Sequence, residues 1–338
     1  MSRGARRRQR QQPRTLQVFL AVVLVLLTVC VLVKAFFLKA PEQKAAELPA
    51  QPAASDTDDS QQSREEQAAQ EALRSHLERK GGFYTILLSG LDDDNGGSDT
   101  NILVAVDTVN GYVYGVSIPR DSKAIIDGKA RKINYAYNKG GTELLADTVS
   151  EQLGIPVDYT VSVNLKGFTA LVDAIGGVDF DVPINMDYDD PIQNLSIHFK
   201  KGVQHLSGAD ALRVVRFRHN NDGSGYGSED LGRMATQQKF LKAVAKKMLS
   251  AGNILTKIDD YAKIFNQYVD TNLTVGNLAW LGTEVLKMGV DKIDFSTLPN
   301  AWKYPYIYLD PTETLTLVNT YLNPYVEDRT ADDLNIPG

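Results

Sequence analysis

The sequence is poor in the residues that usually carry soft-metal, redox or nucleophile chemistry. Its single cysteine, Cys30, cannot form a disulfide within the chain, and no cysteine cluster is present to hold zinc or an iron–sulfur centre. The four histidines show no spacing typical of metal ligands. A bound metal would therefore rely on oxygen ligands.

Two common catalytic patterns are also missing. The sequence has no Gly-x-Ser-x-Gly elbow, so a hydrolase nucleophile of that kind is not predicted. The glycine-rich stretch 223–227 follows no predicted strand and opens no predicted helix, so we interpret it as a loop and not as a nucleotide-binding motif.

Positive charge is scarce outside the N-terminus. The whole chain has 36 basic and 42 acidic residues, a net charge of −6. Residues 1–39 hold eight of the basic residues and no acidic one, which leaves 28 basic against 42 acidic residues, or −14, for the remainder. Such an acidic body repels a phosphate backbone, so no nucleic-acid partner is predicted. An anionic ligand would need a local cluster of arginines or a metal ion.

One long apolar run lies near the N-terminus, at residues 16–38. Its first eighteen residues have only Gln17 and Thr28 as polar members, and at ~1.5 Å per residue they cross most of a ~30 Å hydrocarbon layer. Six arginines within the first fourteen residues predict a cytoplasmic N-terminus. We expect a single-pass cell-membrane protein with a basic cytoplasmic tail at 1–15, an anchor at 16–38 and an extracellular remainder. A cleaved signal peptide is the alternative, although this run is longer than a usual signal core.

Composition divides the remainder into three parts. Residues 39–82 are rich in small and polar residues and predict a flexible stalk. Residues 83–325 alternate short apolar runs with amphipathic stretches, which predicts an α/β domain, and 326–338 predict a loose acidic tail. The expected strands are 83–89, 101–107, 111–118, 159–164 and 178–182, and the expected helices are 132–139, 142–153, 165–175, 207–217, 231–249, 275–288 and 311–322.

An acidic, glycine-rich loop at 90–100 lies between the first two predicted strands. It carries Asp92 and Asp99 among four aspartates, whose mutual repulsion would be relieved by a hard divalent cation. A solvated turn explains the same composition. The residues alone leave both interpretations open.

Three separate segments bring arginine to predicted loops or helix ends. Arg120 follows the strand-ending Pro119, and Arg216 and Arg218 end a predicted helix. The segment 228–233 supplies Asp230 and Arg233 ahead of Gln237. Together with the acidic loop, these groups fit a metal-bridged dianion such as a pyrophosphate, but ordinary salt bridges explain them equally well.

The aromatic residues near the C-terminus have two interpretations. Trp280, Trp302 and the tyrosine-rich stretch 304–308 could stack on sugar rings. We favour buried packing for them.

Several of these segments, taken in order, resemble motifs of the LytR-CpsA-Psr family of envelope proteins. The resemblance covers residues 83 to 322 and is carried by Ser98-Asp99-Thr100, Ser117-Ile118-Pro119-Arg120-Asp121, the stretch KINYAY at 132–137 with Gly140-Gly141, LVDAIGGV at 171–178, LSGADAL at 206–212, Arg216-Phe217-Arg218 and Asp230-Leu231-Gly232-Arg233.

The resemblance implies a three-layer α/β/α sandwich around a mixed central sheet, preceded by a single transmembrane helix. It also implies transfer of a glycopolymer from a polyprenyl pyrophosphate carrier, whose chain occupies an apolar pocket, to peptidoglycan or a similar wall acceptor. The implied cofactor is Mg²⁺ or Mn²⁺, and the implied partners are the polyprenyl lipid, the glycopolymer, peptidoglycan and the membrane.

The resemblance also assigns residues. Asp92 and Asp99 would hold the metal, and Asp99 and Arg120 would be catalytic. Substrate binding would fall to Arg120, Lys132, Arg216, Arg218, Asp230, Arg233 and Gln237.

The chain departs from the family pattern at two positions. Gly97 and Thr236 stand where family members carry arginine, and each missing guanidinium removes ~1.5–3 kcal/mol of charge-assisted hydrogen bonding. Lys123, Arg131 or Lys132 would have to compensate. A non-catalytic protein that binds the lipid carrier or wall glycan, and a pyrophosphate hydrolase, are therefore the alternatives to a transferase.

Overall fold

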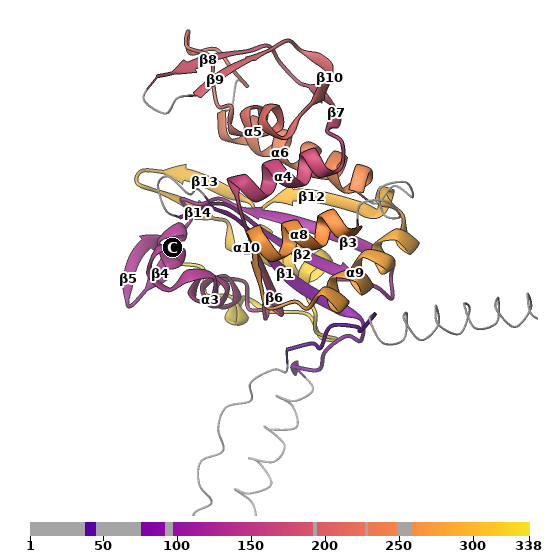
Figure 1. Cartoon of the computed structure of the whole chain (residues 1–338). Coiled ribbons are helices and arrows are strands. Elements are labelled where there is room, and N and C mark those ends of the chain that lie inside the picture. Colours follow the sequence, from indigo (N-terminus) through magenta and orange to yellow (C-terminus); the bar gives the residue numbers. More distant parts are fainter. Residues whose placement is uncertain (1–37, 45–75, 92–96, 192–194, 227–228, 249–257) are drawn as a thin grey trace, which may run out of the picture.

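A six-stranded mixed sheet forms the centre of the computed structural model, which describes residues 38–44, 76–91, 97–191, 195–226, 229–248 and 258–338 (Figure 1). β1 and β3 both run antiparallel to β2, while β6 is parallel to β1 and β12 is parallel to β3. The predicted α/β class with a mixed central sheet is confirmed. The strand order is β11 (Val269–Thr271), β6 (Tyr159–Asn164), β1 (Phe83–Leu91), β2 (Ser98–Asp107), β3 (Tyr112–Ile118) and β12 (Ile293–Thr297).

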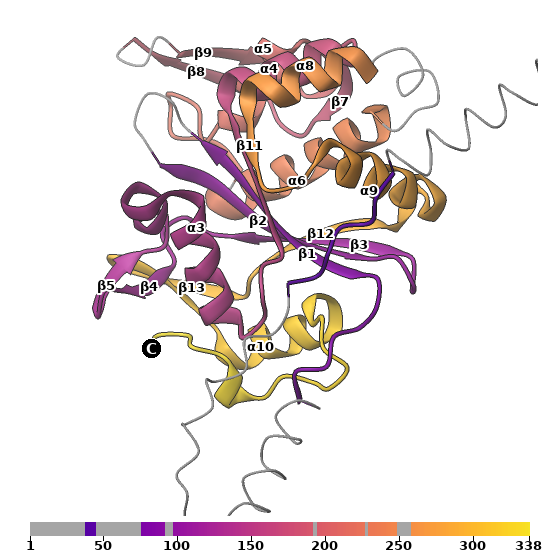
Figure 2. The same cartoon turned by 60° about the horizontal axis from the view of Figure 1, so that its bottom comes forward.

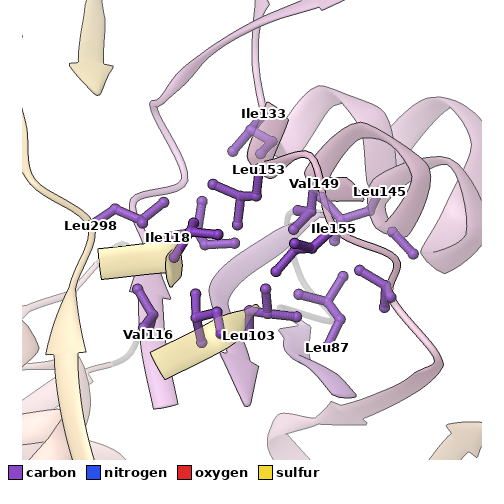
Figure 3. Packing of buried hydrophobic residues seen from close by; sticks show 14 of the residues in the cluster. Leu87, Leu103, Val116, Ile118, Ile133, Leu145, Val149, Leu153, Ile155 and Leu298 are labelled. Atoms are coloured by element: carbon purple, nitrogen blue, oxygen red, sulfur yellow. The ribbon is translucent and has the colours of Figure 1, made fainter. Parts of the chain in front are cut away.

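Helices cover both faces of this sheet (Figure 2). On one face Leu87, Leu103 and Val116 point toward α3 (Asn134–Leu153), where Leu145 and Leu153 meet them (Figure 3). The π-helix at Val318–Leu322, which continues α10 (Pro311–Leu317), packs against the same core. On the other face the alternate side chains of the strands pack against α6 (Glu229–Met248) and α9 (Val275–Met288), as period-two strands require.

A second apolar core lies above the sheet in Figure 1. There, α4 (Leu165–Ala174), α5 (Gly208–Arg216) and part of α6 pack against two antiparallel strand pairs. These pairs are β7 (Val178–Val182) with β10 (Gly202–Leu206), and β8 (Met186–Asp190) with β9 (Leu195–Phe199). α8 (Ile258–Tyr268) contacts α4.

All five predicted strands are present, whereas the helix prediction needs one correction. The two helices expected at 132–139 and 142–153 form the single element α3, kinked at Gly140 and Gly141. Gly141 has φ +67°, a conformation that residues with a side chain rarely adopt, so the kink depends on glycine. The elements that the sequence analysis missed are α8, β8–β12 and two hairpins, β4 (Lys123–Ile126) with β5 (Lys129–Lys132) and β13 (Asn300–Lys303) with β14 (Tyr306–Leu309).

Both ends of the predicted stalk lie against the domain. The Gln43 side chain donates to the carbonyls of Lys80 and Phe83, and the Asn277 amide of α9 donates to the Lys39 carbonyl. The Lys44 N–H donates to the Asp158 carboxylate. Residues 39–44 and 76–82 are therefore parts of the folded body, and the middle of the predicted stalk lies outside the described residues.

The C-terminal residues also differ from the predicted loose tail. The Arg329 side chain is buried over the Tyr325 ring, and the backbone N–H and C=O of Arg329 both bond the Asn319 amide. A short 3₁₀ helix, Ala331–Asp333, follows. Burial of this cation, which the acidic composition did not reveal, fixes the end of the chain.

Residues 16–37 of the predicted membrane anchor lie outside the described part of the chain. Within the described part, no helix has the length and apolar character needed to cross a bilayer.

Candidate active site

The strand ends gather at one edge of the sheet. β1, β3, β6 and β12 all run the same way, so their carboxyl ends meet there, and β2 begins at the same edge because it is antiparallel. In open α/β sheets ligands bind outside the carboxyl ends of the strands. The edge is therefore the expected place for chemistry.

A pocket of about 200 Å³ lies at this edge. It collects residues from the start of β2, the end of β3, the chain after α5, α6 and β14. The lining consists of Asp99, Thr100, Asn101, Ser117, Ile118, Pro119, Arg120, Asp121, Arg218, Arg233, Gln237 and Ile307. Five of the residues singled out from the sequence thus meet in one cavity: Asp99, Arg120, Arg218, Arg233 and Gln237.

Arg120 and Asp99 form an ion pair at the pocket wall. Pro119 has no N–H and ends the β3 ladder, and the turn that follows presents Arg120. The Arg120 Nη1 donates to Asp99 Oδ1 at 2.6 Å, and both side chains are partly exposed. A charge-assisted bond of this kind holds the two opposite charges together at the pocket.

The turn also places a second carboxylate. Asp121 lines the pocket, and Lys132 at the end of β5 pairs with its Oδ1 at 2.9 Å. Lys132 itself is not among the lining residues. It therefore holds Asp121 in place from outside the cavity instead of contacting the pocket directly.

The helix end at Arg216 separates the two arginines of the predicted fork. α5 ends there, and Phe217 is extended (φ −61°, ψ 133°) and fully buried. Arg218, the next residue, lines the pocket, whereas Arg216 does not. The fork is thus only half present in this cavity, because the change from helix to extended chain turns the two side chains differently.

α6 contributes one face to the pocket. Arg233 and Gln237 are four residues apart and so lie one above the other on the helix. The Gln237 amide donates to the Val215 carbonyl. The Gln238 amide, which the sequence analysis did not single out, bonds Ser296, Thr297 and Ser117 at 2.8 to 3.2 Å and ties α6 to the ends of β12 and β3.

A tyrosine packs directly on α6 beside Arg233. A Cβ added at Gly232 would lie 2.2 Å from the Tyr226 Cβ, so glycine is required for this close approach. Burial raises the pKa of Tyr226 above its ordinary value. Tyr226 also meets the Phe217 ring edge-on, and this contact links α6 to the segment that carries Arg218.

The two departures from the family pattern have structural counterparts. Gly97 has φ +132°, and a Cβ there would meet the Asn138 Oδ1 at 3.0 Å, so an arginine would be strained at this position. Thr236 is buried and bonds the Gly232 carbonyl within α6. Of the suggested substitutes, Arg131 lies over the Tyr135 ring and Lys123 bonds the terminal Gly338.

Asn101 is the lining residue that sequence reasoning missed. It is 1% exposed, and neither atom of its amide has a hydrogen-bond partner among the residues that the structure describes. The hydroxyls of Ser89, its neighbour on β1, and of Ser98 are buried and unpaired in the same way. Unpaired buried polar groups are costly, so this cluster points to a ligand that completes them. An asparagine inside an otherwise apolar strand was the available signal.

Two predicted site residues, Asp92 and Asp230, have no described side chain. Asp92 lies outside the described residues, as does the side chain of Asp230. Within the described part of the chain, no group of three or more His, Cys, Asp or Glu residues could hold a metal ion. The predicted metal pair is thus represented by Asp99 alone.

Comparison with known proteins agrees with this geometry. The family model described as the LytR_cpsA_psr family matches residues 49–322, more than three quarters of the chain. The chain belongs to the LytR-CpsA-Psr family.

Two of the matching relatives are named after the same activity, teichoic acid transfer. The chain is 37% identical over 202 residues to the polyisoprenyl-teichoic acid–peptidoglycan teichoic acid transferase TagV of Bacillus subtilis, and 37% identical over 195 residues to the transferase TagU of Bacillus cereus. These alignments cover 57% and 56% of the chain but only 50% and 60% of the two relatives. The crystal structure of B. subtilis TagV matches with a TM-score of 0.60 and 32% identity, over 71% of this chain and 96% of that one.

Proposed function

We propose that the chain is a membrane-anchored phosphotransferase that moves a glycopolymer, such as a teichoic acid, from a polyprenyl pyrophosphate carrier to peptidoglycan. The observation that carries the proposal is the convergence of Arg120, Arg218 and Arg233 with Asp99 in one pocket at the carboxyl edge of the sheet. Three guanidinium groups gathered in a protein of net charge −6 suit a polyanionic ligand. The names of the relatives supply the substrate class.

The reaction is a displacement at phosphorus. An acceptor sugar hydroxyl attacks the phosphorus that bears the glycan, a new phosphodiester forms, and the bond to the polyprenyl phosphate breaks. The proton of the hydroxyl leaves to a carboxylate or to solvent, and Asp99 and Asp121 are the carboxylates of the pocket. The arginines stabilise negative charge on the transferring and leaving oxygens, so the protein acts mainly by positioning and electrostatics.

We propose that Mg²⁺ or Mn²⁺ binds on the side of the pocket that carries oxygen ligands. Asp99 and the unpaired Asn101 amide oxygen belong to it, and these are the ligand types that hard cations prefer. Asp92, which precedes β2 in the sequence, is the proposed second carboxylate. A cation held there would neutralise charge on the pyrophosphate oxygens.

The proposed setting is the outer face of the cell membrane. The apolar run at 16–38 would be the anchor, with residues 1–15 in the cytoplasm. The polyprenyl chain would then reach the pocket from the same bilayer. Ile118 and Pro119 are apolar members of the lining that it would meet.

A first prediction tests the role of the charged pair. Arg120→Ala and Asp99→Ala should each lower transfer at least a hundredfold. Arg120→Ala removes a positive charge from the reacting phosphates, and Asp99→Ala removes a proposed cation ligand and the partner of Arg120. Both side chains are partly exposed, so the melting temperature should change little. Arg213→Ala is the matched control, since Arg213 pairs with Asp210 on α5 and does not line the pocket.

The measurement uses the full chain in detergent with a short-chain lipid pyrophosphate glycan, Mg²⁺ and soluble peptidoglycan fragments. Glycan linked to the fragments is the expected product. Glycan phosphate released to water would instead identify a hydrolase, and bound but unchanged donor would identify a carrier-binding protein. Full activity in both pocket variants would remove the catalytic assignment.

A further inference from the structure

The geometry points to an acceptor site next to the pocket: we propose that the β4–β5 and β13–β14 hairpins form a surface that binds the peptidoglycan strand. This surface, called the hairpin surface below, consists of Lys129, Arg131, Trp302, Lys303 and Tyr304. The inference rests on the proposed function, because it names where the second substrate of that reaction is held.

The two hairpins are joined to each other and to the pocket. Ser122 and Ile307 form a bridge, the Ile307 N–H donates to the Asp121 carbonyl at 2.9 Å, and the Tyr306 hydroxyl donates to the Ala130 carbonyl at 3.2 Å. Ile307 and Asp121 also line the pocket. Both hairpins lie on the same side of the molecule in Figures 1 and 2. A polymer bound on them would therefore lead directly to the cavity.

Large aromatic side chains project from this surface, contrary to the expected buried packing. Trp302 is 60% exposed and Tyr304 is 85% exposed. Tyr308 is partly covered by cations, with the Lys123 and Lys303 ammonium groups 5.0 and 5.8 Å from its ring centroid. Flat aromatic faces of this kind suit the apolar faces of sugar rings while leaving polar groups in water.

The surface is basic in an acidic chain. The four strands carry five basic residues, Lys123, Lys129, Arg131, Lys132 and Lys303, and no acidic one, and Asp127 in the β4–β5 turn is paired with Lys139. Among the described residues, Lys129, Arg131 and Lys303 form no ion pair. The complementary partner is a carboxylate-bearing glycan, which is what peptide-substituted peptidoglycan presents.

The direction of attack distinguishes acceptor from donor. An in-line displacement needs the attacking oxygen opposite the leaving oxygen. Arg218 and Arg233 enter the pocket from the chain after α5 and from α6, whereas Asp121 and Ile307 form the wall next to the hairpins. The leaving polyprenyl phosphate takes the wall with the two arginines, and the hydroxyl then enters past Asp121, from the hairpin surface.

The test measures binding and transfer separately in the full chain in detergent. The probe is a soluble, peptide-bearing disaccharide oligomer of peptidoglycan, titrated by calorimetry. Trp302→Ala with Tyr304→Ala, and Lys129→Glu with Lys303→Glu, should each weaken binding about tenfold or more. In transfer assays the KM for the acceptor should rise by a similar factor, while kcat at saturating acceptor and the affinity for the lipid donor stay near wild type.

Two controls guard against general effects. Lys200→Glu with Lys201→Glu makes the same charge change at exposed positions near the β9–β10 turn and should leave acceptor binding unchanged. Trp302→Tyr keeps a flat aromatic face and should retain most of the affinity. Unchanged melting temperatures confirm that the hairpins remain folded.

The outcomes separate this inference from the proposed function. Fragment binding that depends on the hairpin surface, without any transfer, would leave the surface standing and reject the transferase. Transfer that is indifferent to both double variants would reject the surface alone. Loss of donor affinity instead of acceptor affinity would assign the hairpins to the donor glycan and overturn the proposal.

Discussion

Asn101 shows how one side chain can be costly to stability and useful to function. Its amide lies at the pocket, almost completely buried and unpaired within the described residues, so the free protein bears the desolvation penalty. Bound phosphate or cation would supply the missing partner. Active sites commonly retain such groups at the expense of stability.

Because the Asn101 amide is unpaired in the ligand-free protein, replacing it should affect stability and donor binding in opposite directions. Asn101→Leu, nearly the same size, should leave the ligand-free protein as stable or more stable, yet weaken binding of the lipid donor about tenfold or more. The control is Asn323→Leu, because Asn323 is equally buried but its amide bonds Glu327 and Tyr325. That change should cost ~1–3 kcal/mol. Thermal unfolding and donor titration provide both readings, and a strongly destabilised Asn101→Leu protein would contradict the argument.

At the scale of elements, the central sheet was predictable because its main strands are long and apolar. The short hairpin strands beside the site were not predictable. The runs of apolar residues in β1, β2 and β3, which are mostly buried in the structure, predicted these strands. β4, β5, β13 and β14 have only four residues each, too few for a periodic pattern, and they pair beside the sheet instead of within it.

The site residues that lie within recognisable sequence motifs were predictable. Arg120, Arg218 and Arg233 were found from segments that resemble the family, and the sheet brings them together. The exclusion of Arg216 depends on where α5 ends, and the unpaired state of Asn101 depends on contacts made after folding. Neither can be read from residue spacing.

The β8–β9 hairpin carries a pH-dependent cluster. His198 Nδ1 bonds Asp187 at 2.7 Å, and its Nε2 faces Ser196 and Asp189. The hydrogen bond to Asp187, joined by the nearby Asp189 charge, raises the pKa of His198 above its ordinary value of 6.5. Protonated His198 therefore stabilises the folded state fully below about pH 6.5. This contribution is lost as the pH rises through the higher pKa that His198 has in the folded protein.

We predict that Asp187→Asn lowers the pKa of His198 toward its ordinary value. NMR titration of the imidazole resonances measures this directly, and His205, which pairs with Asp179 on the adjacent strand pair, is the internal reference. An unchanged titration of His198 in the variant would show that Asp187 is not the main cause of the shift.

At the scale of the whole molecule, distant segments of chain meet at Asp158. This carboxylate is fully buried and pairs with Arg79, while it accepts hydrogen bonds from Lys44 and Thr85. Nearby, Arg79 and Tyr325 form a bridge that brings in the C-terminal residues. The residues before β1, β1 itself and the C-terminal residues are thus held together around Asp158.

Removing the Asp158 carboxylate should destabilise the entire fold. Asp158→Ala leaves the Arg79 guanidinium buried without its partner and should lower the free energy of unfolding by ~3–5 kcal/mol. The exposed pair of Asp294 with Lys242 is the comparison, and Asp294→Ala should cost less than about 1 kcal/mol. Denaturant unfolding measures both, and equal small losses would mean that Asp158 is not a structural centre.

The contacts of residues 39–44 fix where this segment joins the folded body. Lys39 is bonded to α9 and Lys44 to Asp158, so both hold a set position relative to the sheet. If the apolar run at 16–38 is the proposed anchor, these contacts determine the height of the pocket above the lipid headgroups. Insertions or deletions within residues 45–75 should then leave that height unchanged, because those residues follow Lys44 in the sequence.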